Sequence, residues 1–423
     1  MLLTTFSATL ADALRTKLRR LIHNEPRLGE RLEVHSMDAI GERLYAKQFG
    51  RPKLLDRAAL RDLLAQGLAA HPEAKVTLPF LLSEWHDLVD AWQLASWEAY
   101  RDVKRLGRKT RLPEARRQVL WSIFETVRVR LDAERALTHA GLFSRLAAQL
   151  ATRKQPPFDF AVIDEAQDIG VAQLKFLAAL GAARPNGLFF AGDLGQRIFQ
   201  QPFSWLSLGV DIRGRARTLR VNYRTSHQIR MQADRLLGEE VSDVDGITES
   251  RRGAVSVFNG PLPAIRVFDT PQEEATAAGT WLTERIAEGV APHEIGIFVR
   301  AEMQLPRARD AVTRAGLPFK VLDEHVETTS GQVSVSTMHL AKGLEFRAVA
   351  VMACDDEVIP LQARIEAVAD DADLEEIYET ERHLLYVACT RARDHLLVTS
   401  VSPASEFLDD LRMPVDEREP LRS

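Results

Sequence analysis

Two short apolar segments, each ending in an acidic residue, place the tightest limits on how this chain can fold. They are Phe160–Asp164 and Gly187–Asp193, and a segment with helical periodicity separates them. Apolar runs of this length, alternating with helices, are typical of strands buried in a parallel sheet. Side chains at the carboxyl ends of such strands lie at the sheet edge where ligands bind. The sequence therefore predicts a parallel α/β fold with an acidic site at one edge.

The same alternation of strands and helices extends over most of the chain. Two further strands are predicted near the N-terminus, at residues 2–6 and 32–36. A second α/β block predicts strands at Arg217–Val221, Ala264–Asp269, Ile295–Val299, Val333–Thr337, Ala348–Met352 and His395–Thr399. Residues 238–260 are acidic and poor in apolar side chains, so we expect a surface loop there. Residues 355–373 form a second acidic, irregular stretch.

These patterns divide the chain into predicted domains. Residues 56–150 show helical periodicity and no convincing strand, so we expect a helical insert at 51–152. Residues 1–50 and 153–213 then form one α/β domain. Residues 214–423 form a second α/β domain.

Composition excludes several classes of protein. The chain has 423 residues, 45% hydrophobic and 27% charged, which is the composition of a globular protein of more than one domain. Two cysteines are too few for a disulfide framework, and neither a membrane-spanning run nor a signal-like N-terminus is present, so a cytoplasmic protein is expected. The net charge of −5 means that nucleic-acid binding would need a local basic surface. The basic run Arg101–Arg117 is one candidate, and a solvated helix face is the alternative.

The Asp164-Glu165 pair has two interpretations when it is considered alone. After a strand, such a pair can hold a magnesium ion and polarise a water molecule. It can also be a helix N-cap with an acidic first turn. The surrounding segments favour the first interpretation, because polar residues recur in seven segments along the chain. In order, these segments are Thr4–Leu10, Val34–Met37, Val162–Asp168, Phe190–Phe199, Leu219–Ser226, Val335–Phe346 and Glu381–Arg393.

In this order the seven segments resemble motifs Ia, Ib, II, III, IV, V and VI of the UvrD/Rep-like superfamily 1 DNA helicases. The resemblance covers nearly the whole chain. It implies two RecA-like parallel-sheet domains of the P-loop NTPase type, the first of them incomplete, with a helical insert. It also implies ATP hydrolysis coupled to 3′→5′ movement on single-stranded DNA, with RNA as an open alternative. A non-catalytic nucleic-acid-binding or assembly subunit derived from such a helicase is the alternative function.

The resemblance implies roles at one ATP site. It assigns Asp164 to Mg²⁺, Glu165 to the catalytic base, Gln196 to a γ-phosphate sensor, Arg224 and Arg391 to the γ-phosphate, Tyr223 to the nucleotide base and Glu345 to the ribose. Guanidinium groups suit the phosphate role because they stay charged and grip phosphate oxygens with a planar fork. The competing interpretations are that the arginines form surface ion pairs and that the tyrosine is buried in the core.

The resemblance also implies a track for a single strand, along Thr5, Phe6, His35 and His339. Phe6 could instead be a core residue, and either histidine could be a satisfied polar residue. After Phe199 the sequence departs from the family pattern, and Phe203 or Trp205 is expected to supply the stacking face in place of the family's tryptophan. Both aromatic residues could equally be buried.

One family motif has no match in this chain. The glycine-rich phosphate loop that ends in Gly-Lys-Thr or Gly-Lys-Ser is absent, since Lys342-Gly343 belongs to the motif V match. The loop, its strand and its helix are expected upstream of Met1, and without them an apolar flank is expected to be exposed and tight MgATP binding lost. A truncated boundary, a natural paralogue without the loop, or a second polypeptide that supplies it would each explain the absence.

The spacing between segments supports two further expectations. The 110 or so residues between motifs IV and V suggest that the second helical subdomain of larger relatives is reduced or absent. A protein partner such as a nuclease or repair factor is possible, although the chain carries no additional nuclease-like carboxylate cluster.

Overall fold

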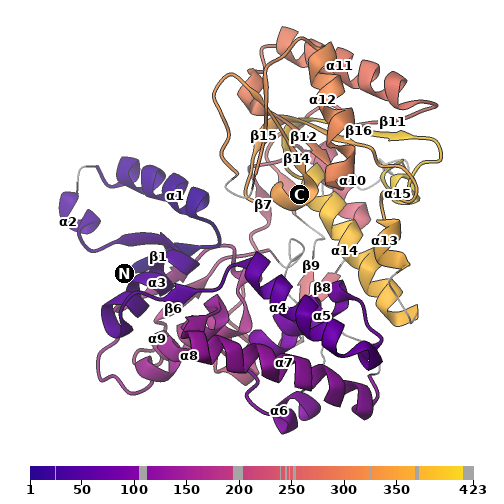
Figure 1. Ribbon diagram of the computed structural model, residues 1–423. Coiled ribbons are helices and arrows are strands. Elements are labelled where there is room, and N and C mark those ends of the chain that lie inside the picture. The colour runs from indigo at the N-terminus through magenta and orange to yellow at the C-terminus, as the bar shows by residue number, and fades with distance from the viewer. Residues whose placement is uncertain are drawn as a thin grey trace. The chain divides into compact units, whose positions relative to one another are not determined.

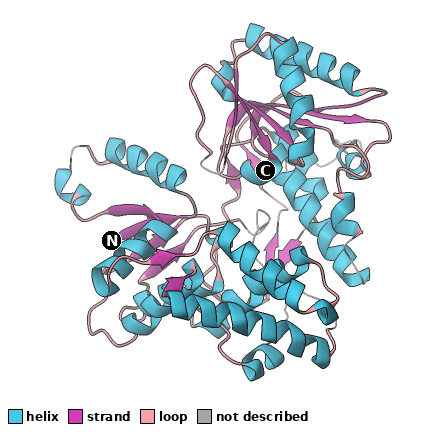
Figure 2. Cartoon of the chain, in the orientation of Figure 1, coloured by secondary structure: helices cyan, strands magenta, loops and turns pink. Residues whose placement is uncertain are grey.

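The computed structural model describes residues 1–23, 25–103, 112–193, 203–238, 240–242, 245–246, 248–250, 254–323, 326–366 and 371–412 (Figure 1). The chain forms two compact units, each with its own parallel sheet (Figure 2). Unit 1 comprises Met1–Asp193, Phe199–Ala216 and Asp243–Ile247, and unit 2 comprises Leu194–Ile198, Arg217–Ser242 and Thr248–Ser423. No described helix is long and apolar enough to cross a membrane. The predicted α/β class with parallel sheets is confirmed.

Unit 1 contains a four-stranded parallel sheet in the order β2-β1-β5-β6. Its strands are β1 (Leu2–Thr5), β2 (Glu33–Ser36), β5 (Ala161–Ile163) and β6 (Leu188–Phe190). The helices that pack against it are α1 (Ala8–Leu21), α3 (Met37–Phe49), α8 (His139–Leu150) and α9 (Val171–Gly181). The four strands predicted in this region are confirmed; β6 ends three residues before Asp193, and the other ends differ by one residue.

The two faces of this sheet are covered very differently. Leu2, Ala161 and Ile163 point to the face that α3, α8 and α9 bury in a common apolar core. Leu3, Val162 and Phe189 are register partners on the other face. On that side only α1 is present among the described helices, and it contacts β1 and β2 (Figure 1). Over β5 and β6 this face is open, and Phe189 is 62% and Phe160 45% exposed.

A helical region lies between β2 and β5 in the sequence and has its own core. Its helical elements are α4 (Arg57–Ala70), η1 (Pro72–Ala74), α5 (Leu78–Glu84), η2 (Trp85–Asp90), α6 (Trp97–Asp102) and α7 (Glu114–Glu134). Tyr100, Trp121 and Phe124 are buried at its centre, and Tyr100 donates a 2.8 Å hydrogen bond to buried Glu84. The expectation of no strand in this region was nearly right, but β3 (Lys53–Leu54) pairs with β4 (Ala136–Leu137). The limits 51–152 for an insert remain a prediction.

Unit 2 contains a six-stranded parallel sheet in the order β11-β16-β15-β12-β14-β13. The strands are β11 (Ala264–Phe268), β12 (Ile295–Val299), β13 (Phe319–Val321), β14 (Val333–Thr337), β15 (Phe346–Met352) and β16 (Ala392–Val401). One face packs on α10 (His227–Ala233), α14 (Asp371–Cys389) and α15 (Phe407–Arg412), and the other on α11 (Pro271–Ala287) and α12 (Leu305–Arg314). All five residues of β12 are buried, as expected for a central parallel strand.

Three predictions about the second block need correction. Of the strand predicted at Arg217–Val221, only Val221 is in a strand, β7 (Val221–Asn222), which pairs with β10 (Val255–Ser256) outside the main sheet. Leu219 is exposed, so the apolar run there is not a buried strand. The loop predicted at 238–260 contains β10 and the hairpin β8 (Glu240–Ser242) with β9 (Thr248–Ser250). The irregular stretch at 355–373 includes a short helix, α13 (Gln362–Ile365).

Candidate functional site

The carboxyl edge of the unit 1 sheet brings the acidic pair next to two neighbouring strands. Asp164 follows β5 directly, and its backbone N–H donates to the Thr4 carbonyl of β1 at 2.8 Å. On the other side, the N–H of Ala191 donates to the Ile163 carbonyl at 2.8 Å. Asp164 and Glu165 therefore lie at the sheet edge predicted for them, between the ends of β1 and β6.

Glu165 has an unusual backbone conformation that a neighbouring side chain supports. Its φ of 54° and ψ of 45° are left-handed, a conformation that costs a non-glycine residue on the order of 1 kcal/mol and is common at functional sites. Buried Gln167 donates from Nε2 to the Glu165 carboxylate and accepts at Oε1 from the Asp193 N–H at 3.1 Å. Gln167 thus joins the acidic pair to the end of β6.

Gln167 is a site residue to which the sequence analysis gave no role. A Cβ on Gly192 would lie 2.4 Å from Gln167 Oε1, so the residue between Ala191 and Asp193 must be glycine for this contact to form. The combination of Gln167 with the Gly192-Asp193 pair was a signal in the sequence, but only the fold shows that they touch.

The electrostatics of Asp164 suit a cation ligand. Burial raises the pKa of the Asp164 carboxyl, and the negative charge of Glu165 raises it further. Two carboxylates at one edge can hold a hydrated Mg²⁺ with few protein ligands, as this ion prefers. The described residues contain no group of three or more His, Cys, Asp or Glu side chains that could enclose a metal. Asp164 and Glu165 are the residues of unit 1 that could hold a partly hydrated Mg²⁺, and the sequence offers no phosphate-binding loop beside them.

The three predicted strand-track residues of unit 1 have different environments. Phe6 is 50% exposed, so the alternative that it belongs to the core is wrong. The Thr5 side chain is buried, and its hydroxyl has no hydrogen-bond partner among the described residues, so its contact with nucleic acid stays a prediction. His35 is partly buried and lies 3.3 Å from Glu33, and burial together with Arg43 lowers its pKa, so it is neutral near pH 7.

The two aromatic residues proposed to replace the family's tryptophan are packed against protein. The rings of Trp205 and Phe190 pack edge-on, with their centroids 4.8 Å apart. Both Phe203 and Trp205 contact the core of unit 1. Phe203 lines a cavity of about 280 Å³ whose wall includes Asp38, Asp87 and Asp90. Both rings are therefore partly buried, and their role as a stacking face stays a prediction. Gln196 lies outside the described residues, as do residues 104–111 of the basic run.

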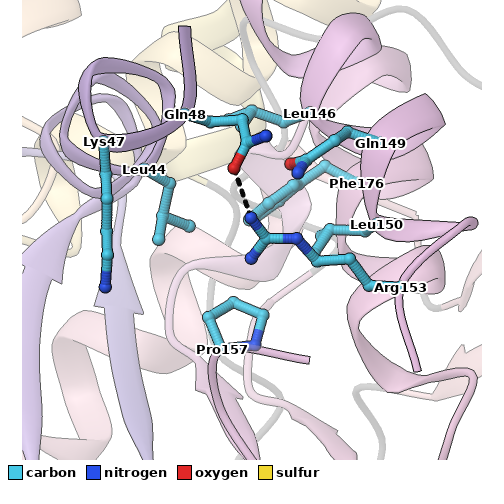
Figure 3. A pocket seen from close by; sticks show the side chains of 9 residues that line it. All are labelled: Leu44, Lys47, Gln48, Leu146, Gln149, Leu150, Arg153, Pro157 and Phe176. Carbon is cyan, nitrogen blue, oxygen red and sulfur yellow. Dashed lines mark hydrogen bonds between the residues drawn. The ribbon is translucent and has the colours of Figure 1, made fainter. Parts of the chain in front are cut away.

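A second cavity in unit 1 is too small for a nucleotide. It lies between α3, α8 and α9 (Figure 3) and has a volume of about 40 Å³. Leu44, Leu146 and Phe176 line it, and Arg153 donates to the Gln48 side chain at its mouth. A space of this size accommodates a few water molecules at most.

Unit 2 brings together three of the predicted nucleotide-site residues around one carbonyl. The Leu344 carbonyl accepts from Arg224 Nη2 at 2.8 Å and from Arg391 Nη1 at 3.4 Å. Arg224 Nε also lies 3.0 Å from Glu345 Oε1. Residues 224, 344–345 and 391 come from separate parts of the sequence, and they meet where β15 and β16 begin.

The surroundings of these residues decide between their earlier interpretations. Arg391 is only 1% exposed, and its Nε donates to the Val387 carbonyl at 3.0 Å, so the surface ion-pair alternative is wrong for this residue. Arg224 does form an ion pair, with Glu345 as partner. Tyr223 is 74% exposed, so the alternative that it is a core residue is also wrong. Both guanidinium groups are held by acceptors of their own unit.

His339 lies at the opposite edge of the same sheet, in η9 (Met338–Leu340) after β14. Burial lowers its pKa to about 4, with a further lowering by Arg300 that exceeds the opposing effect of Glu381. The imidazole is therefore neutral at pH 7. A neutral ring can stack or donate one hydrogen bond, but it contributes no charge to phosphate binding.

Comparison with known proteins agrees with the order of motifs. The chain matches the UvrD/REP helicase N-terminal domain over residues 1–201 and the UvrD-like helicase C-terminal domain over residues 322–403. A probable DNA helicase of Mycoplasma pneumoniae is 25% identical over 257 residues, covering 58% of this chain and 44% of that protein. The ATP-dependent DNA helicase UvrD2 of Mycobacterium tuberculosis is 23% identical over 390 residues, covering 68% and 55%. The chain spans about half the length of these curated relatives.

One solved structure aligns with part of the chain. It is the C-terminal domain of a possible DNA helicase from Lactobacillus plantarum, with 22% identity, covering 45% of this chain and 95% of that domain. Its TM-score of 0.32 is too low to support a shared fold. The two domain matches and the ordered motifs show that the chain belongs to the UvrD/Rep-like family of DNA helicases.

Proposed function

We propose that this chain provides most of an ATP-driven motor that moves 3′→5′ along single-stranded DNA. The observation that carries the proposal is the cluster around the Leu344 carbonyl. It unites Arg224, Glu345 and Arg391, to which the family resemblance assigns one nucleotide. Arg224 and Arg391 lie far apart in the sequence yet share one backbone acceptor, and Arg224 also contacts Glu345. The relatives' printed names, DNA helicase and ATP-dependent DNA helicase, support the same substrate and nucleotide.

Each unit has its own proposed task. In unit 1, Asp164 would hold Mg²⁺, and Glu165 would accept a proton from the attacking water. In unit 2, Tyr223 would contact the base, Glu345 the ribose, and Arg224 and Arg391 the phosphates. When bound, MgATP would supply the phosphoryl group and the free energy of its transfer. Arginines that must leave the Leu344 carbonyl to reach a phosphate would link nucleotide binding to a change within unit 2.

The open face of the unit 1 sheet supports a further part of the proposal. Parallel sheets are normally covered on both faces, yet Phe160 and Phe189 are exposed beside β6, the edge strand. We propose that a β–α unit with the phosphate-binding loop pairs with β6 and covers these rings. The rest of a longer polypeptide or a separate chain could provide it. Without that unit, this chain is expected to bind single-stranded DNA but not to hydrolyse ATP.

The absence of a phosphate-binding loop from this sequence also favours a second candidate function, a non-catalytic nucleic-acid-binding subunit. The DNA sequence upstream of Met1 separates the two. An in-frame segment that encodes a Gly-Lys-Thr-like loop supports the motor, and an in-frame stop codon before any such segment supports the subunit.

Two assays of the purified chain test the proposal. Fluorescence anisotropy with labelled oligothymidylate measures binding, and phosphate release from ATP with and without that oligonucleotide measures turnover. We expect saturable binding and no stimulated turnover. Failure to bind oligothymidylate would contradict the proposed substrate. Turnover that Glu165→Gln abolishes would show that this chain needs no additional β–α unit.

A further inference from the structure

A buried carboxylate in unit 2 is shared by two arginines. Glu381, on α14, has no exposed surface and accepts from Arg300 through both oxygens, at 2.5 Å each. Its Oε1 also accepts from Arg364 Nη1 at 2.9 Å. Arg300 follows β12 directly and is buried, whereas the Arg364 side chain, on α13, is 38% exposed.

The charges of this cluster do not balance. Two guanidinium groups share one carboxylate, and nearby His339 is neutral because its pKa is about 4. Arg300 uses two donors in a fork-to-fork contact with Glu381, the geometry that neutralises a guanidinium best. Among the described residues, Arg364 bonds this carboxylate through Nη1 alone, and its other N–H donors are left for a ligand. The excess positive charge therefore lies on the member of the cluster that solvent can reach.

The cluster also lies where a ligand can approach. Arg300 and His339 follow β12 and β14, which are neighbours in the sheet, so both are at its carboxyl edge. Arg300, Glu381 and Arg364 are the charged groups that act on the pKa of His339. Arg364 therefore lies near the same edge. Glu381 holds Arg364 at this edge through a carboxylate that is itself fully buried.

We propose that Arg364 binds a backbone phosphodiester of the nucleic-acid strand, with Glu381 as the residue that positions it. This proposal rests on the proposed function, since it assumes that the strand passes His339. An exposed guanidinium on a buried carboxylate has lost part of its conformational freedom before binding, so less entropy is lost when a phosphate arrives. Arg364 lies in the acidic stretch 355–373, where the sequence analysis assigned no binding residue.

The test is the salt dependence of oligonucleotide binding by the full chain. Labelled oligothymidylate and oligouridylate of about 16 nucleotides, long enough for a single-strand site, are titrated between about 50 and 200 mM salt. For Arg364→Gln we expect affinity to fall roughly three- to tenfold, and the slope of log K against log salt to become shallower by about 0.7. Arg364→Lys should restore the slope but not all of the affinity, because lysine retains the charge without the fork.

Arg309→Gln is the matched control, because Arg309 is an exposed arginine on α12, which packs on the opposite face of the sheet. It should leave affinity and slope unchanged. An unchanged slope in Arg364→Gln, with normal wild-type binding, would overturn the proposal. Absence of wild-type binding to both oligonucleotides would instead contradict the proposed function. A loss of affinity for only one oligonucleotide would also contradict a backbone contact, since both carry the same phosphodiester.

Discussion

Both units contain a parallel sheet, but the two sheets differ in how completely helices cover their faces. In unit 2, helices cover both faces of six parallel strands, and the central strand β12 is buried at every residue. In unit 1, α3, α8 and α9 cover one face of four strands, while Phe160 and Phe189 are exposed on the other. The residues proposed to grip phosphate differ in the same way. Those of unit 2 meet at one carbonyl, whereas unit 1 presents carboxylates without a phosphate cradle.

This difference indicates what each unit can do alone. A sheet with two covered faces can position Arg224 and Arg391 from its own packing. We propose that the sheet with an open face needs another element before its edge becomes a nucleotide site.

The largest effect is expected from truncating aromatic rings on the two sheets. Phe298→Ala removes a fully buried ring of β12 that packs on Phe346, and should reduce the free energy of unfolding of unit 2 by about 3–5 kcal/mol. Phe189→Ala removes an exposed ring and should change the stability of unit 1 by less than about 0.5 kcal/mol. Urea unfolding followed by circular dichroism measures both. Equal losses would contradict the open face.

Removing the link between the acidic pair and β6 should have a smaller but clear effect. Gln167→Ala leaves the Asp193 N–H without its acceptor and the Glu165 carboxylate without its donor, at a cost of about 1–3 kcal/mol in unit 1. Thermal unfolding of unit 1 measures the loss. Gln66→Ala is the control, because Gln66 is an exposed glutamine on α4 of the same unit. The positioning role of Gln167 fails if both variants unfold at the same temperature.

The raised pKa of Asp164 gives a pH-dependent prediction. A carboxyl whose folded-state pKa exceeds its unfolded value destabilises the fold when ionised, and this cost disappears as pH falls through the folded pKa. Asp164→Asn should therefore raise the melting temperature of unit 1 at pH 7.5 and bring little change near pH 3. Asp159→Asn serves as the control, because Asp159 is an exposed carboxylate paired with Arg184. A gain for Asp164→Asn that does not depend on pH would contradict the cause assigned to the shift.

The smallest effect on stability is expected at the open face, where solubility should change instead. Phe160→Ser with Phe189→Ser removes exposed apolar surface, which proteins rarely display in contiguous patches unless it is covered by a partner. The double variant should bind less of the dye ANS and scatter less light at high concentration, with unchanged circular dichroism. Leu219→Ser, at an exposed leucine of unit 2, is the comparison. Unchanged ANS binding would mean that the rings are covered in solution.

The strands of both units could be predicted from sequence because parallel strands are short, apolar and separated by helices. Ile295–Val299 and Val333–Thr337 were predicted to the residue. The strand predicted at Arg217–Val221 was wrong because its alternating apolar side chains, Leu219 and Val221, are exposed rather than buried. β13 was missed because Phe319–Val321 is only three residues long and lies at the sheet edge, where apolar patterning is weak.

The site was predictable in its residue types but not in its contacts. Motif order located Arg224, Glu345 and Arg391, yet no pattern indicates that Arg391 is buried or that Leu344 offers the shared acceptor, since a backbone carbonyl has no sequence signature. Likewise, the roles of Gln167 and Glu381 depend on partners that only the fold brings near. The contact of Trp205 with Phe190 likewise depends on the fold, because the two rings are 15 positions apart in the sequence.

We propose that unit 1 needs one further β–α unit with a phosphate-binding loop before it can form a nucleotide site. The test is to fuse such a unit from the Mycobacterium tuberculosis relative ahead of Met1 and to measure ATP hydrolysis with oligothymidylate. We expect stimulated turnover in the fusion, none in this chain alone, and loss of turnover by several powers of ten in the fusion with Glu165→Gln or Arg391→Ala. A folded fusion that binds oligothymidylate but does not hydrolyse ATP would contradict the claim, as would turnover that Glu165→Gln leaves unchanged.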